Sequence, residues 1–138
     1  MASDDDAYHE LCGYTLTHGD PAFIHQHVVD AFAAQHAVEG VKPIGITFAL
    51  VGLYLLVEKQ FTGREVQRAH MKLGRQKQTW PAIRFPSTRG SMTAIDVMAA
   101  PAGAARDRAI HAWGASVWEA FADNRQTVVD LLRQHGIV

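Results

Sequence analysis

The chain has one cysteine, Cys12, among its 138 residues, which excludes an internal disulfide and is typical of a reducing compartment. It also lacks internal repeats, low-complexity segments and the apolar–polar alternation of strands. The first residues, Met1 to Asp6, are acidic and contain no apolar run, so they do not form a signal peptide. The net charge is only −1, so overall electrostatics favour no class of partner. We therefore expect a cytoplasmic protein.

No apolar run is long and clean enough for a membrane span. The longest one, from Val41 to Val57, contains Lys42 and two glycines and falls short of about 20 apolar residues. Pro43 suits the first position of a helix, and apolar side chains then occur nearly all round it up to about Phe61. We therefore expect a buried central helix and no membrane partner.

Helical periodicity runs through most of the chain, and the length fits one domain, 1–138. Helices are predicted over residues 7–17, 21–38, 43–61, 63–76, 93–99 and 106–135. Thr62 and Glu65 have the spacing of a capping box, and a break near Asp123 would divide the last helix into two. The sequence predicts an all-α fold, an irregular bundle of five or six helices, with residues 1–6 disordered.

Residues 18–38 hold the densest histidine content of the chain and a clear helix start. Asp20 is expected to cap this helix, and Pro21 to take its first position. On a helical wheel, Asp30 falls opposite the apolar stripe and is expected to be solvated. Gln35 falls inside the stripe, where a buried amide needs hydrogen-bond partners. Two explanations for it are open: a structural bond to a neighbouring backbone, or contact with a ligand.

A metal site is the first candidate for chemistry. His9 and Cys12 are three residues apart, which places an imidazole and a thiol on one helix face. An antiparallel hairpin with the next helix brings His25 or His27 alongside them, and His70 lies on a later helix. Nitrogen and sulfur ligands suit Zn²⁺, or iron or copper. The predicted ligand set is His9, Cys12, His25 and His70. The alternative is that the thiol is a small buried side chain and the histidines are surface or capping residues.

A small-molecule or cofactor pocket between helices is the second candidate. Its predicted lining is His25, Gln35, His36, Tyr54, Trp113 and Trp118. A histidine there, His25 or His111, can act as an acid or base near neutral pH. The alternative is that the aromatic side chains simply belong to the core.

An anion-binding surface is the third candidate. Its residues recur on one side of the predicted 63–76 helix: Arg64, Arg68, Lys72 and Arg75. Residues 59–89 contain eight Lys or Arg and a single acidic residue, Glu65. Nucleic acid, a nucleotide or an acidic protein would suit this stripe, and Trp80 and Phe85 can stack on bases. The alternative is a solvated helix face.

The first half of the chain resembles a bacterial family with no assigned activity, the domain-of-unknown-function family 5946. The matching residues are His25, the pair Val29–Asp30, the pair Gln35–His36 and the pair Cys12–Gly13. The chain departs from the family pattern at His9, where members often have the first cysteine of a Cys-x-x-Cys-Gly element, and near Ala49, where members tend to have a histidine. The resemblance implies that His25, Asp30, Gln35 and His36 belong together, and it implies no reaction.

Three hypotheses follow. The first is a small helical protein that binds a metal ion or small ligand through the histidines and cysteine around residues 18–36. The second is a non-enzymatic module that binds an anionic partner through residues 64–77. The third is a structural bundle, or one that forms a homodimer, with neither of these activities. No nucleophile stands out, so the sequence assigns no reaction.

Overall fold

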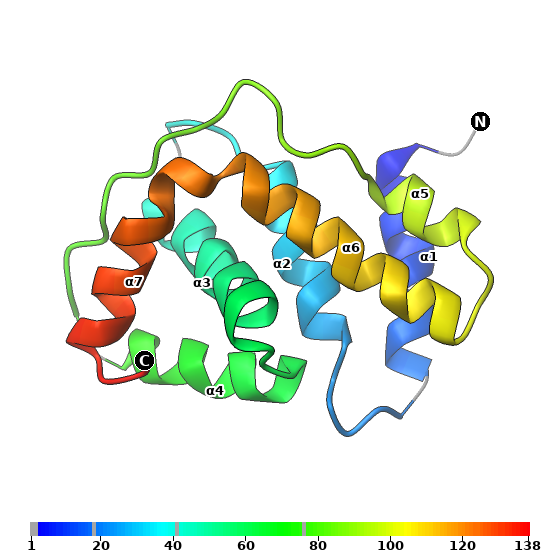
Figure 1. The fold of residues 1–138 in the computed structure, drawn as a ribbon, viewed down its shortest axis with the longest axis horizontal. Coiled ribbons are helices and arrows are strands. Elements are labelled where there is room, and N and C mark those ends of the chain that lie inside the picture. The colour runs from blue at the N-terminus through cyan, green and yellow to red at the C-terminus, as the bar shows by residue number, and fades with distance from the viewer. Residues whose placement is uncertain (1–2, 18, 41, 76) are drawn as a thin grey trace.

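The computed structural model describes residues 3–17, 19–40, 42–75 and 77–138, and within these ranges every regular element is a helix. The bounds are α1 Asp4–Thr17, α2 His25–Gln35, α3 Pro43–Lys59, α4 Gly63–Gly74, α5 Ala94–Ala99, α6 Ala104–Ala120 and α7 Arg125–Gln134 (Figure 1). The all-α prediction is confirmed. The predicted number of helices is too low by one, because the last predicted helix divides at a 3₁₀ turn, Ala122–Asn124.

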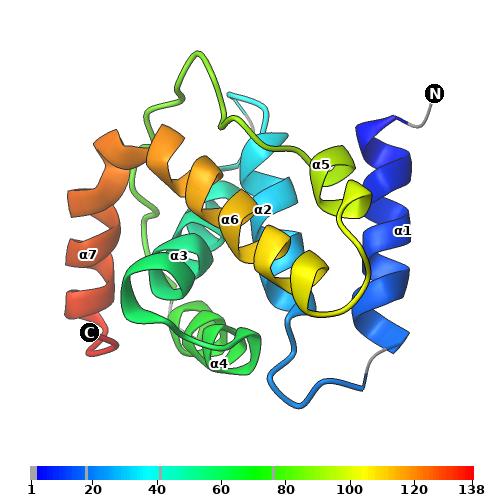
Figure 2. The ribbon, with the colours of Figure 1, turned by 45° about the vertical axis from the view of Figure 1, so that its right-hand side comes forward.

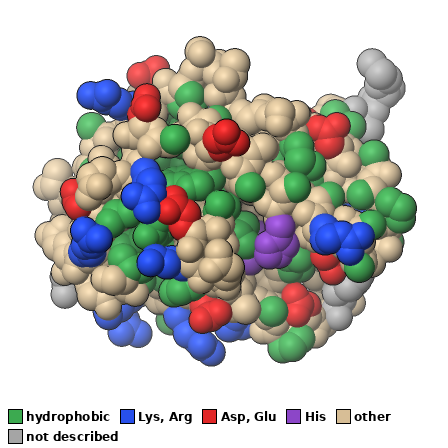
Figure 3. All heavy atoms as spheres, viewed as in Figure 1, with side chains coloured by type: hydrophobic (Ala, Val, Ile, Leu, Met, Phe, Trp, Pro, Cys, Tyr) green, Lys and Arg blue, Asp and Glu red, His purple; other side chains and the backbone are tan. Residues whose placement is uncertain are grey.

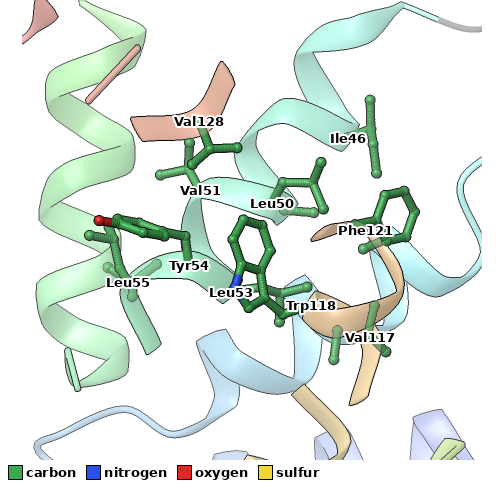
Figure 4. Close-up of a cluster of buried hydrophobic side chains, with 14 of the residues drawn as sticks. Ile46, Leu50, Val51, Leu53, Tyr54, Leu55, Val117, Trp118, Phe121 and Val128 are labelled. Atoms are coloured by element: carbon green, nitrogen blue, oxygen red, sulfur yellow. The ribbon is translucent and has the colours of Figure 1, made fainter. Parts of the chain in front are cut away.

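Helix α3 is the centre of the fold. It contacts α2, α4, α6 and α7, which surround it in Figures 1 and 2. Ten of its residues are buried, as its apolar composition predicts. Figure 4 shows Val51 and Leu53 of α3 in one cluster with Trp118 of α6 and Val128 of α7. No helix among the described residues is long and apolar enough to cross a membrane.

Helices α1 and α2 pack side by side in opposite directions, as predicted from the short segment between them. Three contacts fix their register: Thr15 Oγ1 lies 2.9 Å from His25 Nδ1, Tyr8 stacks on Phe32 with ring centroids 3.8 Å apart, and Asp4 pairs with His36. The chain therefore brings the first turn of α1 to the last turn of α2.

Helix α1 begins earlier than expected. Ser3 Oγ accepts the Asp6 N–H at 3.1 Å, and Asp6 Oδ2 accepts the Ser3 N–H at 3.3 Å, so the two residues cap the helix. The disorder predicted for residues 1–6 is therefore wrong for residues 4–6, and residues 1 and 2 lie outside the described ranges.

Helix α2 begins later than expected, at His25 rather than Pro21. The carboxylate of Asp20 is used on a separate turn, where it accepts the N–H groups of Ala22 at 2.9 Å and Ile24 at 3.1 Å. Asp20, the predicted capping residue, therefore stabilises the turn before α2 and does not cap the first turn of the helix. The capping box of Thr62 and Glu65 at α4 is confirmed.

Residues 77–93 run from α4 across the molecule to α5 without forming a helix (Figure 1). Asn124 holds this segment, because its amide donates to the carbonyl of Arg84 and accepts the Arg84 N–H, both at 2.8 Å. The Arg89 guanidinium donates to the carbonyls at the end of α2, where a cation also complements the helix dipole.

Candidate functional site

The candidate site begins with His27 of α2, whose side chain lies in the interior of the protein. Its side chain is 3% exposed, and its Nδ1 has no hydrogen-bond partner among the described residues. A buried polar atom without a partner costs free energy, so it asks for an explanation. The ring meets His111 of α6 edge-on, with centroids 5.5 Å apart.

His27 and His111 line a hollow of about 170 Å³. The other walls come from the turn that precedes α2 and from the loop between α3 and α4. The remaining lining residues are Asp20, Ala22, Ile24, Gln60, Phe61, Thr62 and Gly63. The hollow thus lies where three separate parts of the chain meet.

Both loops that form this wall adopt unusual backbone conformations. Phe23, with φ 58°, and Gln60, with φ 55°, are the two non-glycine residues with positive φ that the structure records. Gly63 is required for their close approach, because a Cβ there would lie 1.7 Å from the Phe23 carbonyl oxygen. The Arg64 N–H donates to the Ala22 carbonyl at 2.9 Å and joins the loops. Such backbone conformations cost free energy and cluster at functional sites. Their presence here supports the hollow as the candidate functional site.

The electrostatics of the hollow keep His27 neutral. Burial and the neighbouring His111 lower the pKa of His27 to about 4, while the Asp20 carboxylate opposes this shift. The N-terminus of α4 also lies at the hollow, because Thr62 and Gly63 line it. That helix end carries a partial positive charge, and its Arg64 and Glu65 N–H groups already donate to the Ala22 carbonyl and the Thr62 hydroxyl.

Asp30 lies one turn further along α2 and is a second buried polar group, 3% exposed. The prediction that it is solvated is wrong, because α2 packs against α3, α4 and α6 as well as α1. Gln26 Nε2 donates to its Oδ1 at 3.0 Å, and its Oδ2 has no partner within the described part of the chain. Burial raises the pKa of Asp30 well above its ordinary value, which favours the protonated form.

Helix α3 admits Asp30 only because residue 52 is glycine. A Cβ at Gly52 would lie 1.8 Å from Asp30 Oδ2. The carboxyl group therefore occupies the space of a missing side chain in the central helix.

The predicted metal ligands do not come together. No group of three or more His, Cys, Asp or Glu side chains in the described ranges is arranged to hold a metal ion. His70 Nε2 lies 2.8 Å from the carbonyl of Phe48, and burial lowers its pKa. His25 bonds to Thr15, and His9 is exposed. Cys12 is a half-buried free thiol whose pKa is raised by burial.

The predicted cofactor pocket is filled by its own residues. Gln35 donates to the carbonyls of Arg89 at 3.0 Å and Met92 at 2.7 Å, and accepts the indole N–H of Trp113 at 3.0 Å. This confirms the structural explanation for the Gln35 amide, which is half-buried. The rings of Tyr54 and Trp118 pack edge-on in the core, with centroids 5.8 Å apart.

The other predicted pocket residues are also in structural contacts. Trp118 donates its indole N–H to Glu58 at 2.9 Å, and His36 pairs with Asp4. The sequence suggests His27 for a metal site and His111 for a pocket, but it does not predict that these two rings meet. Both histidines are visible in the sequence, but their separation of 84 positions hides the contact that joins them.

The basic stripe lies on the surface, as predicted. The structure exposes all four of its side chains, Arg64, Arg68, Lys72 and Arg75. Figure 3 shows Lys and Arg side chains gathered along the lower edge of this face, over the region of α4.

All residues that line the hollow, including both histidines, lie in the part of the sequence that matches a protein family. No curated protein and no solved structure matches the chain. Residues 5–122 match a family described as a family of unknown function (DUF5946), and this range includes every residue that lines the hollow. Since the match covers far more than half of the chain, the protein belongs to this family.

Proposed function

We propose that the protein binds a small molecule carrying a carboxylate or similar oxygen acceptor in the hollow lined by His27 and His111. One observation carries the proposal: His27 is buried at the edge of this hollow, and its Nδ1 has no hydrogen-bond partner among the residues that the structure describes. Nitrogens of this kind usually have a partner, and a bound ligand would supply one or would be positioned by the ring.

The size of the hollow limits the ligand. Its volume is about 170 Å³, which is close to that of an engineered cavity of about 150 Å³ that holds benzene. A molecule with one small ring, or an aliphatic acid of similar size, fits such a space.

The chemistry of the walls favours an oxygen acceptor. The N-terminus of α4 at Thr62 and Gly63 favours negative charge, as helix N-termini do elsewhere. Each imidazole can donate an N–H to the same group. Asp20 also lines the hollow, but both of its carboxylate oxygens accept backbone N–H groups, which offsets its repulsion of an anion.

Nuclear magnetic resonance of the histidine rings tests this proposal, with benzoate as the probe and benzamide as the neutral control. Benzoate is expected to shift the resonances of His27 and His111 and to raise the His27 pKa above its unliganded value of about 4. The complex then holds more protons than the free protein, so the affinity for benzoate rises as the pH falls through the His27 pKa of the complex toward about 4.

Two variants and one control locate the site. His27→Leu and His111→Leu are each expected to weaken benzoate binding at least about tenfold, the loss expected for removing one hydrogen bond to a charged group. His135→Leu is the control, because His135 lies at the end of α7 and bonds to Gln78. Equal responses to benzoate and benzamide would contradict a carboxylate site.

A parallel titration with Zn²⁺ tests the metal ion that the sequence predicts. Two imidazoles are common zinc ligands, and His27 is already neutral, as a ligand must be. If Zn²⁺ shifts the resonances of both rings and benzoate shifts neither, the ligand of the hollow is a metal ion and not a carboxylate. If neither benzoate nor Zn²⁺ shifts the resonances of the two histidine rings, the hollow is not a binding site and the proposal fails. The free Cys12 thiol is consistent with the cytoplasmic location that we propose.

A further inference from the structure

The charges of this chain are strongly separated along its length. Residues 59–89 contain eight Lys or Arg and one acidic residue, whereas the rest of the chain contains five Lys or Arg and thirteen Asp or Glu. The first turn of α1 carries Asp4, Asp5 and Asp6, and Figure 1 places α1 and α4 in opposite parts of the molecule. A nearly neutral chain therefore presents one distinctly basic surface.

The cations of α4 are available to a partner. Arg64, Arg68, Lys72 and Arg75 span eleven positions, or about 16 Å along the helix. None of the four forms a salt bridge with a carboxylate in the described part of the chain. Glu65, the single acidic residue within residues 59–89, caps the start of α4, where its carboxylate accepts the Thr62 N–H at 3.0 Å.

The aromatic side chain of Trp80 lies beside Arg75, the last of the four cations. Trp80 lines a hollow of about 430 Å³ together with Arg75 and Lys77, and the exposed Ile44 forms another part of its wall. Phe48 supports the indole edge-on, with ring centroids 5.3 Å apart, so the ring is held in place beside the two cations.

We propose that the cations of α4 and the Trp80 hollow form one binding surface for single-stranded nucleic acid. Such surfaces combine a basic track for the phosphates with an aromatic ring on which an unpaired base stacks. An acidic peptide would use the cations but would gain little from a planar ring beside them. This inference does not depend on the ligand proposed for the His27 hollow.

The three tryptophans give a direct test. Trp113 and Trp118 are buried, at 0% and 5% exposure, so stacking from outside can quench only the emission of Trp80. A short oligothymidylate is expected to quench part of the tryptophan emission of the full chain at low salt. The same oligonucleotide in duplex form, and a polyglutamate of similar length, are expected to leave the emission unchanged. Binding without quenching, or equal quenching by polyglutamate, would overturn the proposal.

Fluorescence anisotropy of a labelled oligothymidylate then separates the two parts of the surface. Contacts with four phosphates predict a slope of about −3 when log K is plotted against log salt concentration. Arg64→Glu combined with Arg68→Glu should reduce that slope to about half, and Arg108→Glu on the exposed part of α6 is the matched control.

Trp80→Leu should weaken binding about tenfold at every salt concentration, because it removes one stacked base. Trp80→Phe keeps an aromatic ring and should lose less affinity, which distinguishes stacking from a change in fold. If Trp80→Leu melts as the unchanged protein does and binds equally well, the ring has no part in the surface and the proposal fails.

Discussion

Asp30 is a carboxyl group without access to water, and one of its oxygens has no partner within the described residues. Because its pKa is raised in the folded protein, the folded state keeps a proton that the unfolded chain loses above about pH 4. Stability should therefore fall as the pH rises from about 4 toward the folded pKa. The Asp30 carboxyl group therefore lowers the stability of the folded protein at neutral pH. Its presence despite this loss indicates a role in packing or function.

Asp30→Asn should raise the melting temperature at neutral pH by about 3–5 °C, the shift that roughly 1 kcal/mol produces in a chain of this length. An amide cannot ionise, and its oxygen can still accept the hydrogen bond from Gln26. The gain should disappear near pH 3, where both side chains are neutral. Circular dichroism melts between pH 3 and 8 measure this, with the exposed Asp130→Asn as control. An equal gain at every pH would contradict a proton-linked cause.

Gln35 satisfies three groups at once, since it joins Trp113 to the carbonyls of Arg89 and Met92. Gln35→Leu should lower the free energy of unfolding by at least about 1–3 kcal/mol, because it leaves a buried indole N–H without an acceptor. Adding Trp113→Phe removes that donor and should recover part of the loss. Urea denaturation of the single and double variants measures the coupling, and strictly additive losses would show that the two side chains do not interact.

Helix α3 contains two glycines with opposite surroundings. A Cβ at Gly52 would meet Asp30, whereas at Gly45 it would meet nothing within 4 Å. Gly45→Ala should stabilise the protein by about 0.5–1 kcal/mol, as expected for an unhindered helix position. Gly52→Ala should destabilise it by about 1–3 kcal/mol or more through overpacking.

Combining Gly52→Ala with Asp30→Ala tests the cause of that loss. The second change removes the carboxyl group that the new methyl group would meet, so the pair should lose much less stability than the two single variants together. Urea midpoints of the four proteins complete the cycle. If the double variant loses as much stability as the two single variants added together, the new methyl group does not clash with Asp30.

Local signals in the sequence identify most of the helices but not the candidate site. The capping box at Thr62, the proline that starts α3 and the break near Asn124 each depend on a few adjacent residues, and the structure confirms them. The burial of Asp30 does not follow from periodicity, because one apolar stripe assumes a helix that is covered on one side only. The pairing of His27 with His111 depends on the way α2 and α6 cross, which no local pattern encodes.

The complete fold extends beyond the region that matches the family, since that match ends at residue 122 and α7 follows it. Helix α7 is not an appendage, because it contacts α3 and buries Val128, Val129, Leu131 and Leu132. Each such side chain contributes about 1.5–3 kcal/mol on burial, so the four together contribute roughly 6–12 kcal/mol. That range is comparable to the whole stability of a typical domain, about 5–15 kcal/mol.

A chain cut after Ala122 should therefore fail to unfold cooperatively, although it retains the whole matched region and every residue of the His27 hollow. The cut also removes Asn124, which holds the crossing segment at Arg84. Removal of residues 136–138 alone is the control and should leave a sharp transition. Thermal melts and the dispersion of amide resonances compare the two. A cooperative melt of the shorter chain would show that the matched region folds alone and that α7 only covers it.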